Sequence, residues 1–410
     1  MKILKIERKI MDYKQLAKAN EDVCIKMRRD LHKIPELELD LPKTSKYIKD
    51  KLTEFGIDYK EYVNGNGISA LIEGKNPGKC LAIRADMDAL PITEETGLDF
   101  ASEIEGQMHA CGHDSHMAVA LTALKIINEN KDKLNGSVKF IFQPGEEIPG
   151  GAKPMIDEGV LENPKVDYII GMHGGQLADI PHGKIAFKDN EMMASMDKFS
   201  IRINGHGGHG ASPQATVDPI IVSAEVLLGL QKIISREINP VDSGVVSVCK
   251  IDGGFTQNII PDTVDMMGTA RALSEDVRDT IERRVEEISS CIANTYGASA
   301  EVNYERFYPV LNNDPKFNSF VKNVVGELFE DDIYEMDKPV MGAEDMAFYL
   351  QEVPGSFMFL SNLFQREDGK VYVNHNSKFD LDESLFYKGV ATFVATAFEF
   401  SKGGLDEQDK

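Results

Sequence analysis

The stretch GQMHACGHDSHM, residues 106–117, holds three of the chain's nine histidines and one of its five cysteines. Cys111 and His113 are separated by one residue. In extended chain, residues at that spacing point to the same side, so both can contact one ion. A C-x-H pair alone is weak support for a metal site, and a polar loop rich in imidazole is the alternative. A redox site would need C-x-x-C, which the stretch lacks.

A second stretch, FIFQPGEE, ends an apolar strand at a Pro-Gly turn with Glu146 and Glu147. Taken alone, two adjacent carboxylates at a turn indicate a solvated surface. Because neighbouring side chains diverge, however, one can bind a metal while the other faces a substrate. Metal-dependent hydrolases need both a carboxylate ligand and a carboxylate that takes a proton from water, so the pair favours that chemistry.

Two further histidines stand where ligands are expected. His173 follows the apolar run YIIGM, and sites in open α/β sheets form at the carboxyl ends of strands, although a lone histidine there is more often structural. His375 lies in the polar loop VNHNSKFDLDE. These positions together supply Cys, His, Glu, His and His, which exceeds the four ligands of one tetrahedral zinc and favours two divalent ions. Zinc is expected first, with manganese, cobalt or nickel as alternatives.

The elements that would position these residues alternate between strands and helices, which is typical of an α/β layer architecture. Helical patterns cover residues 12–55 and 114–130, and strands are expected at 67–74, 80–87, 137–144 and 166–173. Towards the C-terminus, the pattern predicts a turn and helix at 340–353, a strand at 356–362 and a helix from about Asp382.

The middle of the chain has a different order of elements. Strands at 197–205, 244–254, 262–273 and 299–309 alternate with helices at 216–238 and 274–297, which is the β-α-β-β-α-β order of ferredoxin-like domains. We therefore expect an α/β protein whose large mixed-sheet catalytic domain, sandwiched by helices, covers 1–194 and 310–410. A smaller ferredoxin-like lid or dimerisation domain would be inserted at 195–309, a usual domain size.

The bulk composition limits the classes of function. A formal net charge of −22 argues against nucleic-acid binding and against an anionic membrane surface, because both need basic residues. The N-terminal MKILKIERKIMDYKQLAKAN is interrupted by charges, so neither a signal peptide nor a membrane anchor is expected. The five cysteines are odd in number and scattered, which favours reduced thiols and a cytoplasmic location.

A series of motifs in a fixed order gives the chain a resemblance to a known family. They are RRDLHKIPELELD, IRADMDALPITEETGLDFAS, MHACGHD, QPGEE, GMH, GHGGHGASP, NIIPD, GTARAL, GAEDMAFYL and HNSKFDLDE. Over nearly its whole length the chain resembles the zinc-dependent amidohydrolase and exopeptidase superfamily. It is most similar to the branch of N-acyl-amino acid amidohydrolases (aminoacylase-like), hippurate hydrolases, auxin–amino acid conjugate hydrolases and N-acetyldiaminopimelate deacetylases.

The resemblance implies a dinuclear metal centre with its catalytic residues. The residues that match metal ligands are Cys111, His113, Glu147, His173 and His375. Glu146 matches the general acid/base that acts on a metal-bridging water. Asp88 matches the aspartate that orients the catalytic centre.

The resemblance also implies how the inserted domain contributes. His209 matches a histidine that stabilises the oxyanion, often across a dimer interface, so a homodimer or higher oligomer through this domain is expected. Asn258 and Arg271 match residues that hold the carbonyl and the carboxylate of the substrate. Arginine suits a carboxylate because the two groups form parallel hydrogen bonds.

The implied reaction is metal-dependent hydrolysis of the amide bond of N-acyl-L-amino acids, such as N-acetyl or N-benzoyl derivatives, to a carboxylic acid and a free amino acid. Two alternatives are enzymes: a metallo-exopeptidase acting on dipeptides and an N-acetyldiaminopimelate deacetylase. A third alternative is a non-catalytic metal-binding protein. Departures from the family pattern at Ile148 and Pro149, at the glycines after His173 and at Gln214 leave the acyl group open.

Overall fold

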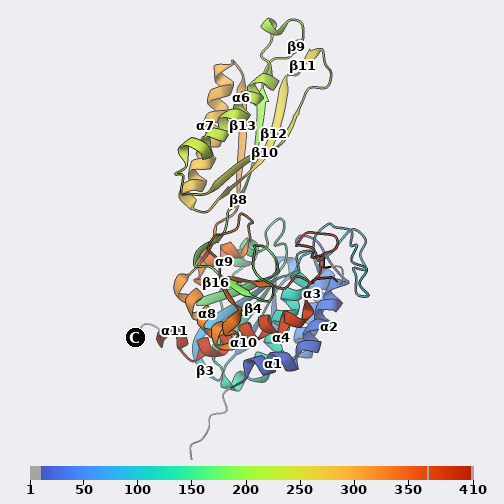
Figure 1. The fold of residues 1–410 in the computed structure, drawn as a ribbon, viewed down its shortest axis with the longest axis vertical. Coiled ribbons are helices and arrows are strands. Elements are labelled where there is room, and N and C mark those ends of the chain that lie inside the picture. Colours follow the sequence, from blue (N-terminus) through green and yellow to red (C-terminus); the bar gives the residue numbers. More distant parts are fainter. Residues whose placement is uncertain (1–10, 367–368, 408–410) are drawn as a thin grey trace, which may run out of the picture. The chain divides into compact units, whose positions relative to one another are not determined.

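Two compact units make up the computed structural model, which describes residues 11–366 and 369–407 (Figure 1). Unit 1 comprises the described parts of 1–190, 313–337 and 349–410, and unit 2 comprises 191–312 and 338–348. Residues 338–348 are predicted from the sequence to belong to the larger domain. They group with unit 2 because the Ala194 N–H bonds the carbonyl oxygens of Val340 and Gly342. The catalytic and lid roles of the two domains stay predictions.

Unit 1 is built on an eight-stranded mixed sheet of order β1-β2-β4-β3-β5-β16-β6-β15. The strands are Tyr59–Tyr62 (β1), Gly67–Glu73 (β2), Asn76–Asp86 (β3), Asn135–Gln143 (β4), Tyr168–Gly175 (β5), Ile185–Phe187 (β6), Ile333–Glu335 (β15) and Gly355–Ser361 (β16). Strands β4, β3, β5 and β16 run parallel to one another, so their carboxyl ends meet at one edge of the sheet. Two short strands, Asn190–Met193 (β7) and Leu311–Asn313 (β14), form a separate pair.

Helices pack against this large mixed sheet, which confirms the predicted α/β class. The helices that lie wholly or partly in unit 1 are Tyr13–Ala19 (α1), Glu21–His32 (α2), Pro42–Glu54 (α3), His113–Glu129 (α4), Ala152–Asp157 (α5), Pro315–Leu328 (α8), Met346–Glu352 (α9), Phe386–Ser401 (α10) and Gly404–Glu407 (α11). Most residues of α4 and α10 are buried, and they share one core with β2, β3 and β4. No helix of the described ranges is long and apolar enough to cross a membrane.

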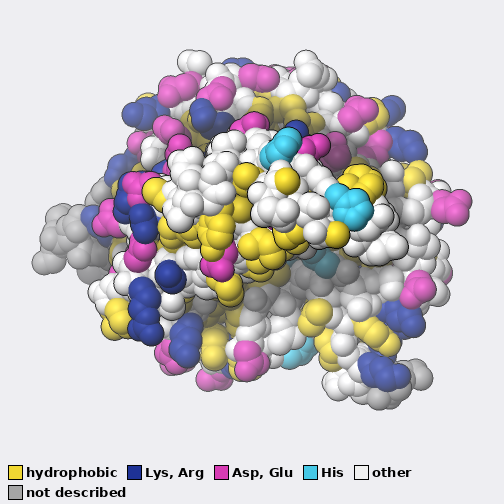
Figure 2. All heavy atoms as spheres, turned by 90° about the horizontal axis from the view of Figure 1, so that it is seen from above, with side chains coloured by type: hydrophobic (Ala, Val, Ile, Leu, Met, Phe, Trp, Pro, Cys, Tyr) yellow, Lys and Arg dark blue, Asp and Glu magenta, His cyan; other side chains and the backbone are white. Residues whose placement is uncertain are grey.

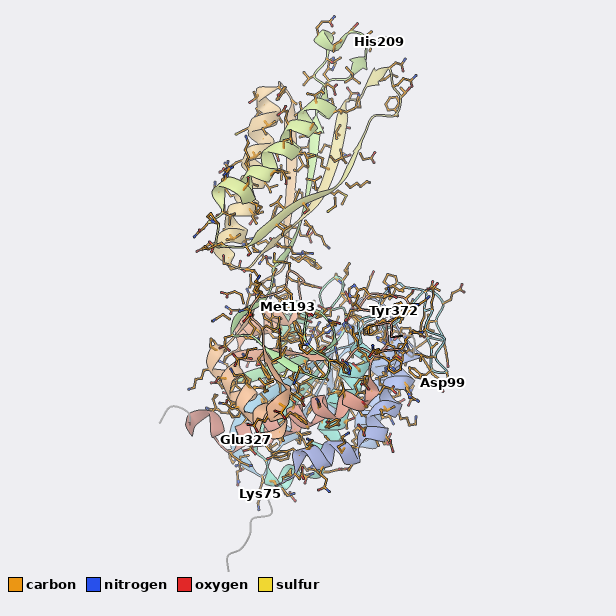
Figure 3. All side chains as sticks on the ribbon, viewed as in Figure 1. Lys75, Asp99, Met193, His209, Glu327 and Tyr372 are labelled. Atoms are coloured by element: carbon orange, nitrogen blue, oxygen red, sulfur yellow. The ribbon has the colours of Figure 1, made fainter. Side chains whose placement is uncertain are left out.

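Unit 2 has the predicted ferredoxin-like order. Its main elements are Met196–Asn204 (β8), Pro219–Lys232 (α6), Gly244–Gly253 (β10), Thr263–Ala272 (β12), Glu275–Thr295 (α7) and Ser299–Tyr308 (β13). The strands form an antiparallel sheet of order β10-β12-β8-β13, which confirms the β-α-β-β-α-β prediction. A short strand pair, Gly208–His209 (β9) and Ile259–Ile260 (β11), lies at the end of the unit where Figure 3 labels His209.

The sequence of β8 shows why the sheet of unit 2 packs on one face only. Phe199, Ile201 and Ile203 are buried and alternate with polar residues that are exposed or half-buried. Helices α6 and α7 supply their apolar partners, and each helix begins at a side-chain cap, Asp218 and Ser274. The edges of this sheet are β10 and β13.

A buried ion pair in unit 2 carries a stability prediction. Asp197 is 1% exposed and accepts hydrogen bonds from Arg278 Nη2 (2.6 Å) and the Tyr304 hydroxyl (2.9 Å). Arg278→Met would leave this carboxylate buried without its counter-ion. We therefore expect the free energy of unfolding, measured in urea, to fall by about 3 kcal/mol. The control Arg202→Met removes only an exposed pair with Asp265 and should change little, and equal losses in both variants would contradict the prediction.

Candidate metal centre

The predicted metal ligands lie at the sheet edge where the parallel strands end. They are Cys111 before α4, His113 at its first residue, Glu147 after β4, His173 in β5 and His375 in the loop between β16 and α10. Because β3, β4 and β5 are parallel, their carboxyl ends bring these segments together. Between Cys111 and His113, Gly112 turns the chain into α4 with φ 91°, a conformation that glycine adopts without steric cost.

The five residues form overlapping groups, in each of which the donor atoms lie within 4.8 Å of one another. One group is Cys111, His113 and His173, and another is Cys111, Glu147 and His375. Cys111 Sγ is 3.4 Å from His173 Nε2, and His375 Nε2 is 3.2 Å from Glu147 Oε1. The structure therefore brings all five residues together, and two groups that share donors fit two neighbouring ions better than one.

Glu146 lies beside these groups. It forms a third close set with His113 and Glu147, and its Oε2 is 4.0 Å from His113 Nε2. The Asp88 carboxylate accepts the backbone N–H groups of Glu146 (2.7 Å) and Glu147 (3.0 Å), one on each oxygen. Asp88 thus holds the turn from which the two glutamate side chains diverge.

Hydrogen bonds fix which nitrogen of each buried histidine faces the centre. His113 Nδ1 donates to the Asp88 carbonyl oxygen (2.9 Å), and His173 Nδ1 donates to the Gly174 carbonyl oxygen (2.7 Å). Carbonyl oxygens only accept, so Nδ1 of each histidine carries a proton, and Nε2 is the nitrogen that can bind an ion. His113 Nε2 is buried and has no hydrogen-bond partner within the described part of the chain. Such an orphaned nitrogen fits a metal ligand.

The charges of the centre also fit cations. Burial raises the pKa of the Cys111 thiol well above its usual value, and the nearby carboxylates raise it further. Burial lowers the pKa of His113, but Asp86 and other carboxylates outweigh this effect and bring the pKa to about 10. Burial lowers the pKa of His173, which keeps that imidazole neutral. The cluster is therefore short of positive charge, which a divalent ion bound to thiolate and imidazole would supply.

The three predicted residues of unit 2 do not lie together. His209 in β9 pairs with Ile259 of β11, next to Asn258, and both predicted residues are exposed. The chain passes from β11 directly into β12, which begins at Thr263. Arg271 lies eight residues beyond Thr263 in that strand, which at roughly 3.3 Å per residue is about 26 Å from Thr263. One small substrate cannot contact both ends of this strand within a single chain.

Arg271 is half-buried and has an unused donor. Its Nη1 is fully buried and finds no hydrogen-bond partner among the residues that the structure describes. Burial lowers the pKa of the guanidinium, which nevertheless stays charged. A buried N–H without an acceptor costs free energy, so this group can gain by binding a carboxylate.

Sequence reasoning missed several residues beside the ligands. His116 and Asp86, which the sequence analysis leaves unassigned, are bonded to each other (2.6 Å), and Asn374 donates to the Cys111 carbonyl oxygen (3.1 Å). The spacing of His113 and His116 in HDSHM places both on one face of α4, a signal that could have found His116. Asn374 gave no comparable signal.

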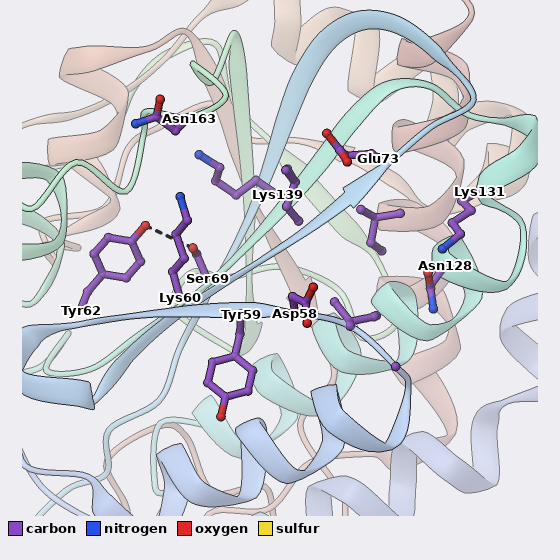
Figure 4. A pocket seen from close by; sticks show the side chains of 14 residues that line it. Asp58, Tyr59, Lys60, Tyr62, Ser69, Glu73, Asn128, Lys131, Lys139 and Asn163 are labelled. Atoms are coloured by element: carbon purple, nitrogen blue, oxygen red, sulfur yellow. Dashed lines mark hydrogen bonds between the residues drawn. The ribbon is translucent and has the colours of Figure 1, made fainter.

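The pocket drawn in Figure 4 is a separate hollow of unit 1 with a volume of about 500 Å³. It is lined from β1, β2 and β4 and includes none of the predicted site residues. Its most buried cation, Lys139, donates to the carbonyl oxygens of Val160 (2.9 Å), Glu162 (2.7 Å) and Pro164 (2.9 Å). All three of its N–H groups are thereby used, so this lysine holds the neighbouring loop rather than a ligand.

Comparison with known proteins identifies relatives along nearly the whole chain. A thermostable carboxypeptidase of Saccharolobus solfataricus is 39% identical over 385 residues, covering 93% of this chain and 96% of the relative. An N-acetylcysteine deacetylase of Bacillus subtilis is 37% identical over 367 residues, covering 89% of this chain and 93% of the relative. The crystal structure of a dinuclear metal-binding peptidase of the M20 family from Bacillus subtilis is 34% identical. It superimposes with a TM-score of 0.80 over 94% of this chain and 99% of that chain.

The family assignment follows from these matches and from a family model. The model that matches residues 82–399 describes peptidase family M20/M25/M40. The matched range includes all of unit 2, much of unit 1 and all ten of the site residues predicted from the sequence. The resemblance stated from the motifs is thereby confirmed, and the chain is a hydrolase that belongs to peptidase family M20/M25/M40.

Proposed function

We propose that the protein hydrolyses the amide bond of N-acyl-L-amino acids and releases a carboxylic acid and a free amino acid. The observation that carries this proposal is the donor set of unit 1, in which five metal-ligand side chains lie together with the adjacent carboxylate of Glu146. The deacetylase relative is named for an N-acyl amino acid, which supports this substrate class. The carboxypeptidase relative favours the second candidate, an exopeptidase acting on dipeptides.

Glu146 is the proposed general acid/base. Two divalent ions held by the five ligands would polarise the substrate carbonyl and lower the pKa of water towards neutrality. Glu146 accepts a proton from the attacking water and passes it to the departing amine nitrogen. Asp88 keeps the Glu146 backbone in place for both transfers. The sulfur and imidazole donors favour zinc as the metal, with manganese, cobalt or nickel as the alternatives.

Residues of unit 2 would bind the substrate. The Ala211 N–H bonds His209 Nδ1 (3.0 Å), so the proton of this imidazole is on Nε2, where it can be donated to an oxyanion together with Asn258. Arg271 would hold the α-carboxylate of the amino acid. Arg271 lies near the end of β12, whereas His209 in β9 pairs with β11, which precedes the start of β12. We therefore propose that His209 and Asn258 act on the site of a second copy of the chain.

Substrate hydrolysis with and without metal tests the proposal. Metal-free protein would be supplied with zinc or manganese and given N-acetyl, N-benzoyl and indoleacetyl amino acids, N-acetyldiaminopimelate and free dipeptides. Metal-dependent release of amino acid from the acylated compounds alone is the expected result. Cleavage of dipeptides alone would establish the exopeptidase, and cleavage of N-acetyldiaminopimelate alone would establish the dedicated deacetylase. Bound metal without hydrolysis of any compound would favour the non-catalytic alternative.

Unit 2 offers a surface for the proposed homodimer. Helix α6 exposes Ile221 (55%) and Leu228 (64%), which lie two helical turns apart on the same side, and β10 is an unpaired sheet edge. Figure 2 shows hydrophobic side chains gathered in a band on the viewed face, among uncharged atoms and near histidines. Pairing of β10 edges and packing of the α6 faces would cover both features with one two-fold axis.

A mixture of two inactive variants tests catalysis across the dimer. Glu146→Gln and His209→Ala, each alone, should have little activity. In an equal mixture that assembles at random, half of the dimers pair the two variants, and each such dimer has one intact site of two. We therefore expect about one quarter of wild-type activity per subunit after co-refolding. Mixed dimers that form, as shown by two affinity tags, but stay inactive would place His209 in its own subunit's site.

A further inference from the structure

The Gly174–Gly175 segment at the end of β5, which directly follows the ligand His173, is bonded by side chains of three separate segments. The Gly174 N–H donates to His116 Nε2 (2.7 Å) of α4. The Gly175 N–H donates to Asn362 Oδ1 (2.8 Å), just after β16. The Gly174 carbonyl oxygen accepts Asn374 Nδ2 (3.3 Å) from the loop that carries His375. Side chains therefore hold both the peptide group before Gly174 and the peptide group between Gly174 and Gly175.

The orientation of one of these peptide groups decides the orientation of His173. Its imidazole donates from Nδ1 to the Gly174 carbonyl oxygen (2.7 Å), and this bond is what turns Nε2 towards Cys111. The same peptide group is fixed at its N–H by Asn362 and at its oxygen by Asn374. Rotation of the peptide would therefore break bonds on both sides and release the imidazole from its present orientation.

His116 is a linker between elements and not a metal ligand. Its Nδ1 lies 2.6 Å from Asp86 Oδ1 at the end of β3, and its Nε2 accepts the Gly174 N–H of β5. Nδ1 must therefore carry the proton, and no lone pair remains for an ion. The Asp86 carboxylate is in turn held by Arg84 (2.7 Å), so the chain of bonds ends on a buried cation. His116 thereby fixes the end of β5 relative to β3.

Asn374 links the three ligand-bearing segments to one another. Besides Gly174, its Nδ2 donates to the Cys111 carbonyl oxygen (3.1 Å), and its Oδ1 accepts the Gln176 N–H (2.8 Å). Its own neighbour in the chain is His375. Close packing here requires glycine, because Gly175 has φ 106° and a Cβ would collide with the Asn374 amide. Gly175, one of the glycines after His173 that depart from the family pattern, thus has a structural reason.

We propose that His116 and Asn374 are positioning residues that clamp the Gly174–Gly175 segment and so hold His173 in place to bind one of the two ions. The inference rests on the proposed ligand set. Within that set, the clamp supports the ion that Cys111 and His173 would bind. Loss of the clamp should weaken that ion more than the ion near Glu147 and His375, because most bonds of the clamp end on the Gly174–Gly175 peptide groups beside His173.

Two substitutions of similar size separate the clamp from simple packing at His116. His116→Gln places an amide oxygen near the former Nε2, so it can still accept the Gly174 N–H. His116→Asn keeps a donor near the former Nδ1 for Asp86 but has no acceptor that reaches Gly174. Titration of metal-free protein with Co²⁺, followed by thiolate–cobalt absorption and by metal content, should show two ions for wild type and His116→Gln. His116→Asn should bind one of its two ions about 10- to 100-fold more weakly.

Asn374→Asp gives an independent variant, because it keeps the acceptor for Gln176 and removes the donor to Gly174 and Cys111. It should weaken the same ion, while His182→Asn, at an exposed histidine, should bind both ions normally. Normal binding of two ions by His116→Asn and Asn374→Asp, or equal weakening in both His116 variants, would overturn the clamp. Wild-type protein that fails to bind two ions would instead overturn the ligand set on which the proposed function rests.

Discussion

Glu146→Gln should lower kcat by about 10²- to 10⁴-fold while the protein still binds two divalent ions. The amide has nearly the same size as the carboxylate but cannot accept the proton of the attacking water. Because Glu146 stands on a turn held through its backbone by Asp88, the substitution should leave the neighbouring ligands in place. Steady-state hydrolysis of an N-acyl amino acid, with metal content measured on the same sample, gives both quantities.

The same substitution one residue later is the matched control. Glu147 approaches His375 to 3.2 Å and shares a donor group with Cys111, so Glu147→Gln should weaken metal binding and restore part of its activity when metal is added in excess. Added metal should not rescue Glu146→Gln. Rescue of both variants by metal, or of neither, would mean that the two adjacent carboxylates do not divide the roles of base and ligand.

Long helices and strands with a regular hydrophobic pattern could be predicted from the sequence. The strands and helices of unit 2 match within a few residues because each is long and has one buried face, as the alternation of Phe199, Ile201 and Ile203 in β8 shows. The three-residue strands β6 and β15 were missed. They exist only through pairing with each other and, for β6, with β16, so their own residues carry no periodic signal.

Two helical regions show the limits of local signals. The region 12–55, predicted to be helical, contains three helices, separated at Asn20 and at residues 33–41. Pro35 disfavours a helical conformation in Ile34, just after α2 ends, and Pro42 occupies the first turn of α3. Helix α8 was not predicted, although Asp314 caps it and Pro315 occupies its first turn.

The candidate site was predictable where ligands follow strands and not where they depend on contacts between elements. Glu147 follows β4 and His173 lies near the end of β5, so the shared edge of the parallel strands brings both residues together. The Nε2 orientation of His173 depends instead on a peptide held by Asn362 and Asn374, nearly two hundred residues away in the chain. No pattern within one segment reports such a contact, and only the fold reveals it.

Arg271→Met should raise KM about 10- to 100-fold for N-acyl amino acids with a free α-carboxylate and should change KM little for the corresponding amides. The wild-type Nη1 is buried and without a hydrogen-bond partner in the described ranges, so the guanidinium gains most when a carboxylate binds. A neutral amide cannot form the same charged pair. The ratio of KM values for acid and amide therefore isolates this contact from other effects of the substitution.

Stability measurements distinguish the proposed substrate contact of Arg271 from a structural one. Arg278 has a buried carboxylate partner, and its loss should destabilise the protein, whereas Arg271 Nη1 has no such partner within the described residues. Arg271→Met should therefore lower the free energy of unfolding in urea much less than Arg278→Met, because Asp197 acts on Arg271 only through its charge and keeps its hydrogen bonds to Arg278. The same substitution at exposed Arg202 should leave both KM values unchanged. Equal increases in KM for acid and amide substrates, with reduced stability, would show that Arg271 supports the fold of unit 2 rather than the substrate carboxylate.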